Sequence, residues 1–160
     1  MKPPSGAAFL LAQLGAHTSS LFAARLAELD LSPAQVGVLR IVGQNPGLSQ
    51  QALSERLGAV PSRVVRLVDE LEARGLVERR RSETDRRNYA LHIAGGAAQE
   101  IAAVRKAVSA HDAAVVSSLS ADELETLLVL LRRIADAEGL KAEAHPAYGA
   151  RTDRPSQGAS

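Results

Sequence analysis

Arginine side chains are concentrated in the middle of this 160-residue chain. Residues 56–87 contain nine arginines and six acidic residues, a local charge of +3, whereas the whole chain has a formal net charge of +1. Guanidinium groups bind phosphate oxygens and guanine edges through paired hydrogen bonds. The distribution therefore points weakly to a partner that carries phosphate, and a solvated charged face is the alternative interpretation.

A helix predicted over residues 61–74 carries some of these arginines on one side. Its apolar positions face one way and are Val64, Leu67, Val68 and Leu71. The other side presents Ser62, Val65, Arg66 and Asp69, with Arg63 at its edge. A hydroxyl, two arginines and a branched apolar side chain can contact the groups that a DNA major groove displays. A purely structural helix with solvated arginines is the alternative.

Two neighbouring elements complete a winged helix-turn-helix pattern. Residues 50–67 fit two helices joined by a tight turn at Gly58, with Ser49 as the N-cap of the first. Residues 77–92 then fit an arginine-rich β-hairpin that contains the motif Asp85-Arg86-Arg87. An arginine at the tip of such a wing can enter a narrow, electronegative minor groove, and Asp85 can pair with Arg87 before binding.

Helices predicted on both sides of this unit set the fold class. Ser32 and Ser120 each open a capping box, with Gln35 and Glu123 three residues later. Further helices are predicted for residues 6–30 and from about residue 96. The chain is therefore expected to be mainly α with a small β-hairpin wing (α+β). We expect flexible ends at residues 1–5 and 140–160, a winged helix-turn-helix region over 31–94, and a helical dimerisation region formed by 6–30 and 95–139.

The flanking helices are more apolar than a small winged domain requires. An apolar stripe runs through residues 101–115, and the last helix is expected to bury Leu124, Leu127, Leu128, Leu131 and Ile134. Burying one more Leu or Ile stabilises by about 1.5–3 kcal/mol, so side chains of this kind favour association into a homodimer. An intramolecular helical core is the alternative.

Composition excludes several other classes of protein. The chain has no cysteine, which excludes disulfides, thiolate metal sites and thiol redox chemistry. We find no nucleophile–base pair and no phosphate-binding glycine loop, and the four histidines lack metal-ligand spacing. No enzyme activity, cofactor or metal is therefore expected. There is no run of roughly 18 apolar residues and no export signal, so we expect a cytoplasmic protein without a membrane partner.

The sequence resembles the MarR family of bacterial transcription regulators. The likeness runs from about residue 6 to residue 139 and is carried by LSPAQ at 31–35, VLR at 38–40, LSERLG at 53–58, VVRLVDELEARGLVER at 64–79 and DRR at 85–87. The resemblance implies a homodimer on double-stranded DNA with an inverted-repeat operator. It implies major-groove contacts from Ser62, Arg63, Val65 and Arg66, a minor-groove contact from Arg87 braced by Asp85, and backbone contacts from Ser49, Gln50, Gln51 and Arg86.

The same resemblance implies a response to a small aromatic or phenolic acid. Candidate effector-binding residues are His17 and His111, which interrupt apolar stripes, and Arg25 or Arg40 as the partner of a carboxylate. A structural role in the core is the alternative for each histidine. The resulting hypothesis is a dimeric repressor that an effector releases from DNA. A winged-helix module that binds a protein, or DNA without sequence preference, is the alternative function.

Overall fold

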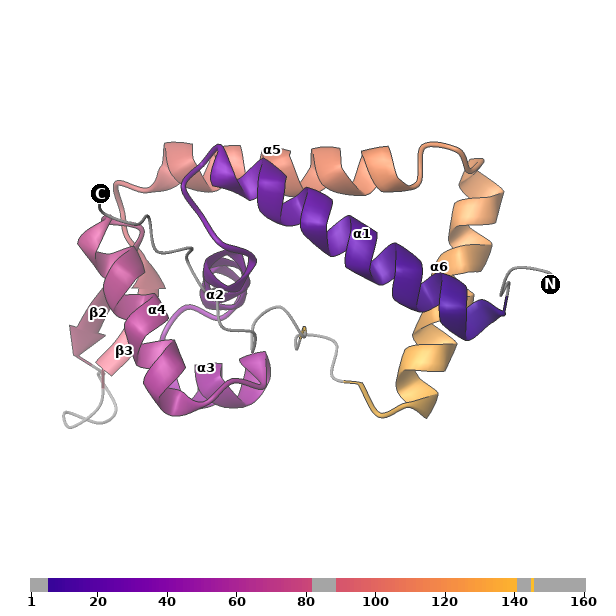
Figure 1. Ribbon diagram of the computed structural model, residues 1–160. Helices are drawn as coiled ribbons and strands as arrows, with labels where there is room; N and C mark the ends of the chain where they lie inside the picture. Colours follow the sequence, from indigo (N-terminus) through magenta and orange to yellow (C-terminus); the bar gives the residue numbers. More distant parts are fainter. Residues whose placement is uncertain (1–5, 82–88, 141–144, 146–160) are drawn as a thin grey trace, which may run out of the picture.

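The computed structural model describes residues 6–81, 89–140 and 145. Within these residues the elements follow in the order α1 (Ala7–Ala27), α2 (Pro33–Gln44), β1 (Leu48–Ser49), α3 (Gln50–Leu57), α4 (Pro61–Ala73), β2 (Val77–Arg81), β3 (Tyr89–Ile93), α5 (Ala98–Val115) and α6 (Ala121–Ala137). The fold is mainly α with a small sheet, as the sequence predicts (Figure 1).

Local sequence signals start α2 and α6 and end α3 at the predicted residues. The Ser32 hydroxyl accepts the N–H of Gln35 at 3.2 Å, and the Gln35 side chain accepts the N–H of Ser32 at 2.8 Å. Ser120 and Glu123 form the same capping box at the start of α6. Gly58 ends α3 with a φ of 63°, a left-handed conformation in which a side chain is unfavourable.

The winged module is built from α2, α3, α4 and the sheet at one end of the molecule (Figure 1). Its core is formed by fully buried aliphatic side chains, among them Val38, Ile41, Leu53, Leu57, Val68, Leu71 and Leu91. Because these residues come from α2, α3, α4 and the central strand β3, the core fixes the orientation of α4 relative to the sheet.

The sheet has three strands in the order β1-β3-β2, all antiparallel. The prediction of a two-stranded hairpin was incomplete, because Leu48 and Ser49 pair with Leu91 and Ala90 as a third strand. The first hairpin strand begins at Val77, where the hairpin was predicted to start. A strand of two residues has no alternating pattern, so it leaves no signal of its own in the sequence.

The long helices α1 and α5 pack side by side and carry α6 away from the winged module (Figure 1). The prediction that α6 buries five apolar side chains is wrong for this single chain, because α6 contains no buried residue. Leu128 and Ile134 are exposed, while Leu124, Leu127 and Leu131 are half-buried. None of these five side chains is fully buried by the described part of the chain.

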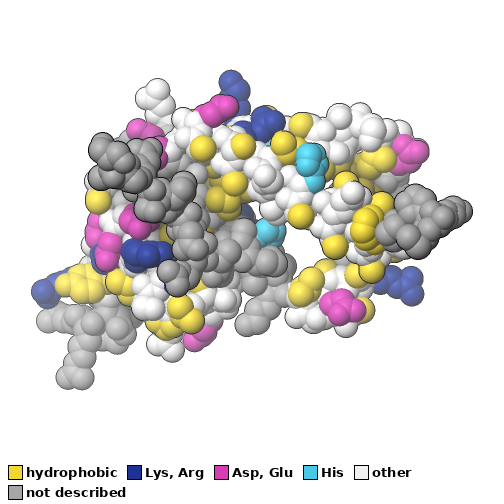
Figure 2. All heavy atoms as spheres, in the orientation of Figure 1, with side chains coloured by type: hydrophobic (Ala, Val, Ile, Leu, Met, Phe, Trp, Pro, Cys, Tyr) yellow, Lys and Arg dark blue, Asp and Glu magenta, His cyan; other side chains and the backbone are white. Residues whose placement is uncertain are grey.

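Helix α1 is unusually apolar for an exposed helix. It has 21 residues and a mean hydropathy of 1.2 over its most apolar window, in which no residue is buried. By length and composition alone it is long and apolar enough to cross a membrane, a weak criterion that soluble helices also meet. Leu10, Leu14 and Leu21 are each more than two-fifths exposed, so a long apolar strip of α1 faces outward (Figure 2).

Candidate nucleic-acid interface

Helix α4 presents a polar face away from the core of the winged module. Val64, Leu67, Val68 and Leu71 are buried beneath it. The exposed side carries Ser62, Val65, Arg66 and Asp69. This division confirms the amphipathic pattern read from the sequence, and it leaves a hydroxyl, a branched apolar side chain and a guanidinium in adjacent turns of one helix.

The two arginines of this helix differ in their surroundings. The Arg66 side chain is 62% exposed, and its Nε lies 3.8 Å from a carboxylate oxygen of Glu70, a weak surface pair. Arg63 is half-buried, and its Nε is buried without a hydrogen-bond partner among the described residues. Arg63 and Arg66 both line a hollow between α4 and the start of α2, alongside Gln35. Arg66 is therefore the more accessible of the two predicted groove contacts.

The start of α3 borders an open groove next to α4. The groove has a volume of about 800 Å³, and its lining includes Gln50, Gln51 and Val65. The Ser49 hydroxyl caps α3 by accepting the N–H of Ala52 at 3.2 Å. Gln51 is exposed, with a long 3.4 Å contact to Glu55. Two of the three residues predicted to lie near phosphates, Gln50 and Gln51, thus line a groove that also reaches Val65 of the helix predicted to read bases, and Ser49 directly precedes them.

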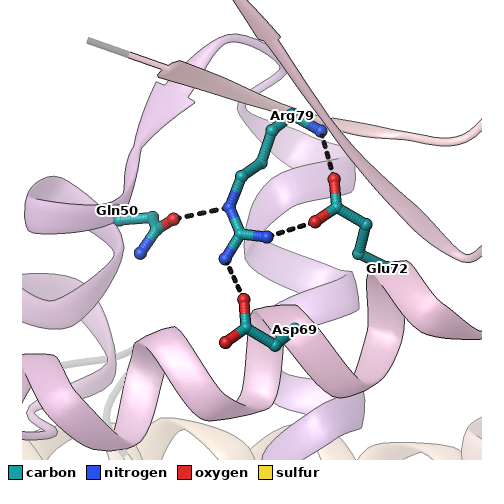
Figure 3. A network of polar contacts seen from close by, with 4 residues as sticks. All are labelled: Gln50, Asp69, Glu72 and Arg79. Atoms are coloured by element: carbon teal, nitrogen blue, oxygen red, sulfur yellow. Dashed lines mark hydrogen bonds and ion pairs between the residues drawn. The ribbon is translucent and has the colours of Figure 1, made fainter.

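Arg79 connects β2 to both helices of this groove (Figure 3). Its Nε donates to Oε1 of Gln50 at 2.8 Å, and one Nη donates to Oδ1 of Asp69 at 2.5 Å. Its other Nη donates to Glu72, whose second oxygen accepts the backbone N–H of Arg79 at 3.1 Å. The Arg79 side chain is only 18% exposed. One guanidinium therefore joins the first residue of α3 to the middle of α4.

The charge of Arg79 is stabilised by this network. Partial burial by itself lowers the pKa of Arg79, but the hydrogen bonds and negative charges of Asp69 and Glu72 outweigh it and raise that pKa above its usual value. The arginine-rich hairpin pattern places Arg79 among the outward charges of the wing and does not predict this network. The available signal was the pair of acids at Asp69 and Glu72, which stand on one face of the helix just before the strand.

The other two arginines of strand β2 differ in their contacts. Arg80 pairs with Glu78 of the same strand at 2.5 Å, and Arg81 at the end of β2 is exposed. Basic side chains are visible at this end of the molecule (Figure 2). The predicted wing residues Asp85, Arg86 and Arg87 lie outside the described residues.

Comparison with known proteins relates this architecture to a family of regulators. The sequence model of the MarR family matches residues 29–88, from the turn after α1 to the residue before β3. The structure is similar to that of the transcriptional repressor CouR bound to a 23-mer DNA duplex. The two chains are 30% identical with a TM-score of 0.73, over 81% of this chain and 92% of CouR. The chain belongs to the MarR family.

Other relatives of this MarR-family chain are also transcriptional regulators. A Thauera aromatica protein assigned as a transcriptional regulatory protein for the hcr operon is 38% identical over 104 residues. That match covers 65% of this chain but only 63% of the Thauera protein, less than two thirds of its length. The PcaV transcriptional regulator of Streptomyces coelicolor is 27% identical, with a TM-score of 0.69 over 85% of this chain and all of PcaV. The chain is thus a MarR-family transcription regulator with a DNA-binding fold.

The histidines and arginines singled out for effector binding line two cavities of this MarR-family fold. A cavity of about 280 Å³ is lined by residues of α1, α2 and α5, among them Phe22, Arg40 and His111. The rings of Phe22 and His111 lie 4.9 Å apart between centroids, at an interplanar angle of 34°. His17 and Arg25 line a more open hollow of about 520 Å³, which His111 also borders. No group of three or more potential metal ligands occurs among the described residues.

Proposed function

We propose that this chain is a homodimeric repressor that binds an inverted-repeat operator in the cytoplasm and is released by a small aromatic or phenolic acid. The observation that carries this proposal is the exposed face of α4, where Ser62, Val65 and Arg66 stand above a fully packed apolar face. A rigid helix with this outward face has the chemistry needed to read base edges in a major groove. CouR, a relative of the same fold, is named as a repressor and was solved on DNA.

In this proposal the contacts divide between the grooves and the backbone. Ser62, Arg63, Val65 and Arg66 contact the major groove, and Arg87 enters the minor groove with Asp85 as its brace. Ser49, Gln50, Gln51 and Arg86 contact the phosphate backbone, where the N-terminus of α3 adds a favourable field for an anion. Because phosphate contacts do not carry sequence information, the α4 residues determine specificity.

The homodimer is supported by the apolar side chains that one chain leaves in solvent. Exposed leucine, valine, isoleucine and phenylalanine side chains gather on α1 and around α6, and include Phe9, Leu14, Leu128, Val129, Leu130 and Ile134 (Figure 2). Several large apolar side chains exposed on neighbouring helices favour association. A two-fold dimer through these helices presents two winged modules, which doubles the number of phosphate contacts.

The proposed effector site is the cavity between α1, α2 and α5. Arg40 supplies a cation for a carboxylate, and the paired rings of Phe22 and His111 supply a surface for an aromatic ring. A volume of about 280 Å³ fits a single-ring acid. The cavity lies between α1 and α5 of the dimerisation region and α2 of the winged module. A ligand bound there therefore changes the distance between the two copies of α4 in the dimer.

The proposal is tested by fluorescence anisotropy of the purified protein with its own upstream DNA and with scrambled DNA, at several salt concentrations. Tight binding to the upstream fragment alone, with two subunits per site, supports a sequence-specific dimeric regulator. Equal, salt-sensitive binding to both fragments supports the alternative of a module that binds DNA without sequence preference. Loss of DNA binding altogether favours a protein-interaction module.

The proposed effector site is tested with 4-hydroxybenzoate as the probe ligand. Release of the upstream fragment at rising 4-hydroxybenzoate concentration is expected, and Arg40→Gln should raise the concentration needed. The matched control is Arg105→Gln, which removes an exposed arginine of α5 that lies outside the lining of both cavities. An equal response from the two variants would remove Arg40 from the effector site.

A further inference from the structure

Gln50 has an amide group whose two ends are chemically different, and the structure determines which end faces Arg79. A guanidinium carries only hydrogen-bond donors. Gln50 must therefore offer its oxygen to Arg79, as it does with a 2.8 Å bond from Arg79 Nε to Gln50 Oε1. The amide nitrogen then points away from the guanidinium (Figure 3). Since Gln50 lines the open groove between α3 and α4, the network leaves a donor group at the groove edge.

Arg79 is itself held in place from the opposite side. Asp69 accepts from one Nη, and Glu72 accepts from the other Nη and from the backbone N–H of Arg79. Both acids stand on α4, whose packing is fixed by its buried apolar face. The Arg79 side chain is 18% exposed, against 57% for Asp69 and 40% for Glu72. The guanidinium therefore lies beneath its carboxylate partners and is poorly placed to reach a phosphate itself.

We propose that Arg79 is a positioning residue for DNA binding, which holds the Gln50 amide with its nitrogen outward as a hydrogen-bond donor to a backbone phosphate. This inference rests on the proposed DNA-binding function. Phosphate oxygens only accept hydrogen bonds, so an amide turned the other way presents its oxygen and repels them. Without Arg79, Gln50 rotates freely between the two orientations, and part of its contribution to affinity is lost.

The first test is Gln50→Glu, measured by anisotropy on the upstream fragment. A glutamate still accepts from Arg79, so the link within the protein survives, but the group at the groove edge becomes a carboxylate oxygen. We expect the Kd to rise by about tenfold or more, because a like charge now faces the phosphate. The matched control is Gln99→Glu, which makes the same charge change on an exposed residue of α5 far along the chain. A rise in Kd no larger than that of the control would overturn the proposal.

The second test asks whether Gln50 and Arg79 act together. Gln50→Met and Arg79→Met keep side-chain length and remove the polar groups. If Arg79 acts through Gln50, the Kd of the double variant for DNA is close to that of the single variant with the higher Kd. A double variant whose loss equals the product of the two single losses would show independent roles and overturn the proposal. Thermal unfolding by circular dichroism checks that each variant is folded, and the Gln50→Glu comparison stands if Arg79→Met does not fold.

The wild-type measurement separates this inference from the function on which it rests. If the wild-type protein binds no DNA, both fall. If it binds the upstream fragment and Gln50→Glu binds as well as the control, only the role of Arg79 and Gln50 falls.

Discussion

Arg74 at the end of α4 donates from one Nη to the backbone carbonyl oxygen of Asp30 at 2.5 Å. Its second Nη donates to the carbonyl oxygen of Leu29 at 3.1 Å. Both carbonyl groups lie just after α1, in the turn that leads to α2. The C-terminal end of the helix predicted to read DNA is therefore bonded directly to the turn that ends the long helix of the proposed dimer.

Arg74→Ala is expected to lower the free energy of unfolding by about 1–2 kcal/mol, because it removes two hydrogen bonds to backbone carbonyls at the surface. Urea denaturation followed by circular dichroism measures the change. The control is Arg105→Ala, which removes an exposed arginine from the interior of α5 and should change stability by less than about 0.5 kcal/mol. Equal stabilities for the two variants would show that the Arg74 bonds contribute nothing.

Asp30 has a φ of 53°, the left-handed conformation that most side chains avoid. Asp30→Val should destabilise by about 1–2 kcal/mol because a β-branched side chain is strained there. Asp30→Gly should change the free energy of unfolding little. Glycine relieves the strain in the folded state, but it also increases the conformational entropy of the unfolded chain, and the two effects oppose each other. The two variants keep the carbonyl that Arg74 binds, so the difference between their unfolding midpoints isolates the backbone conformation. A valine variant as stable as the glycine variant would contradict this account.

The Ser32 cap makes a further prediction about stability. Ser32→Ala removes the hydroxyl that accepts the Gln35 N–H and should lower the free energy of unfolding by about 1 kcal/mol. The Gln35 side chain also donates to Glu70 of α4 at 3.0 Å, so the capping box of α2 is hydrogen-bonded to α4 as well. Ser109→Ala, at an exposed site within α5, is the control and should be neutral or slightly stabilising. Equal unfolding temperatures for the two variants would show that the Ser32 cap does not stabilise the protein.

These cases show which parts of the structure follow from sequence alone. The capping boxes at Ser32 and Ser120, the turn at Gly58 and the buried side of α4 were all predicted, because each depends on residues within one or two helical turns. The winged helix-turn-helix fold followed from their order. Such local patterns carry their own physical signal.

The features that were missed depend on residues far apart in the chain. Strand β1 exists only because Leu48 and Ser49 meet β3, more than forty positions later by the register. The Arg79 network joins positions 29, 10 and 7 residues away. The acids at Asp69 and Glu72 signal a partner for an arginine of the strand, but they do not tell which of the three consecutive arginines turns toward them. In the proposed homodimer, the burial of the apolar side chains on α6 likewise depends on the second chain.

The exposed position of Arg66 leads to a prediction about specificity. Arg66→Ala should reduce discrimination between the operator and base-substituted operators by about 1–3 kcal/mol at one base pair, the range of a bidentate guanine contact. The slope of log Kd against log salt should change little. A uniform loss of affinity across sequences, with a slope lower by about one, would instead make Arg66 a phosphate contact. Anisotropy on a panel of substituted fragments distinguishes the two outcomes.

Helix α6 provides the test of the proposed dimer. Leu128 and Ile134 are exposed in the single chain at 40% and 45%, on the apolar side of the helix. Leu128→Glu and Ile134→Glu should each raise the dimer Kd more than 100-fold, since a two-fold interface loses the burial of both copies, about 3 kcal/mol or more. Gln99→Glu adds the same charge at an exposed site near the start of α5, outside α6, and should remain dimeric. Light scattering after size exclusion gives the mass of each variant, and circular dichroism verifies its helices. If both apolar-side variants stay dimeric at low micromolar concentration, the chains do not associate through this face, and the apolar side of α6 requires another partner.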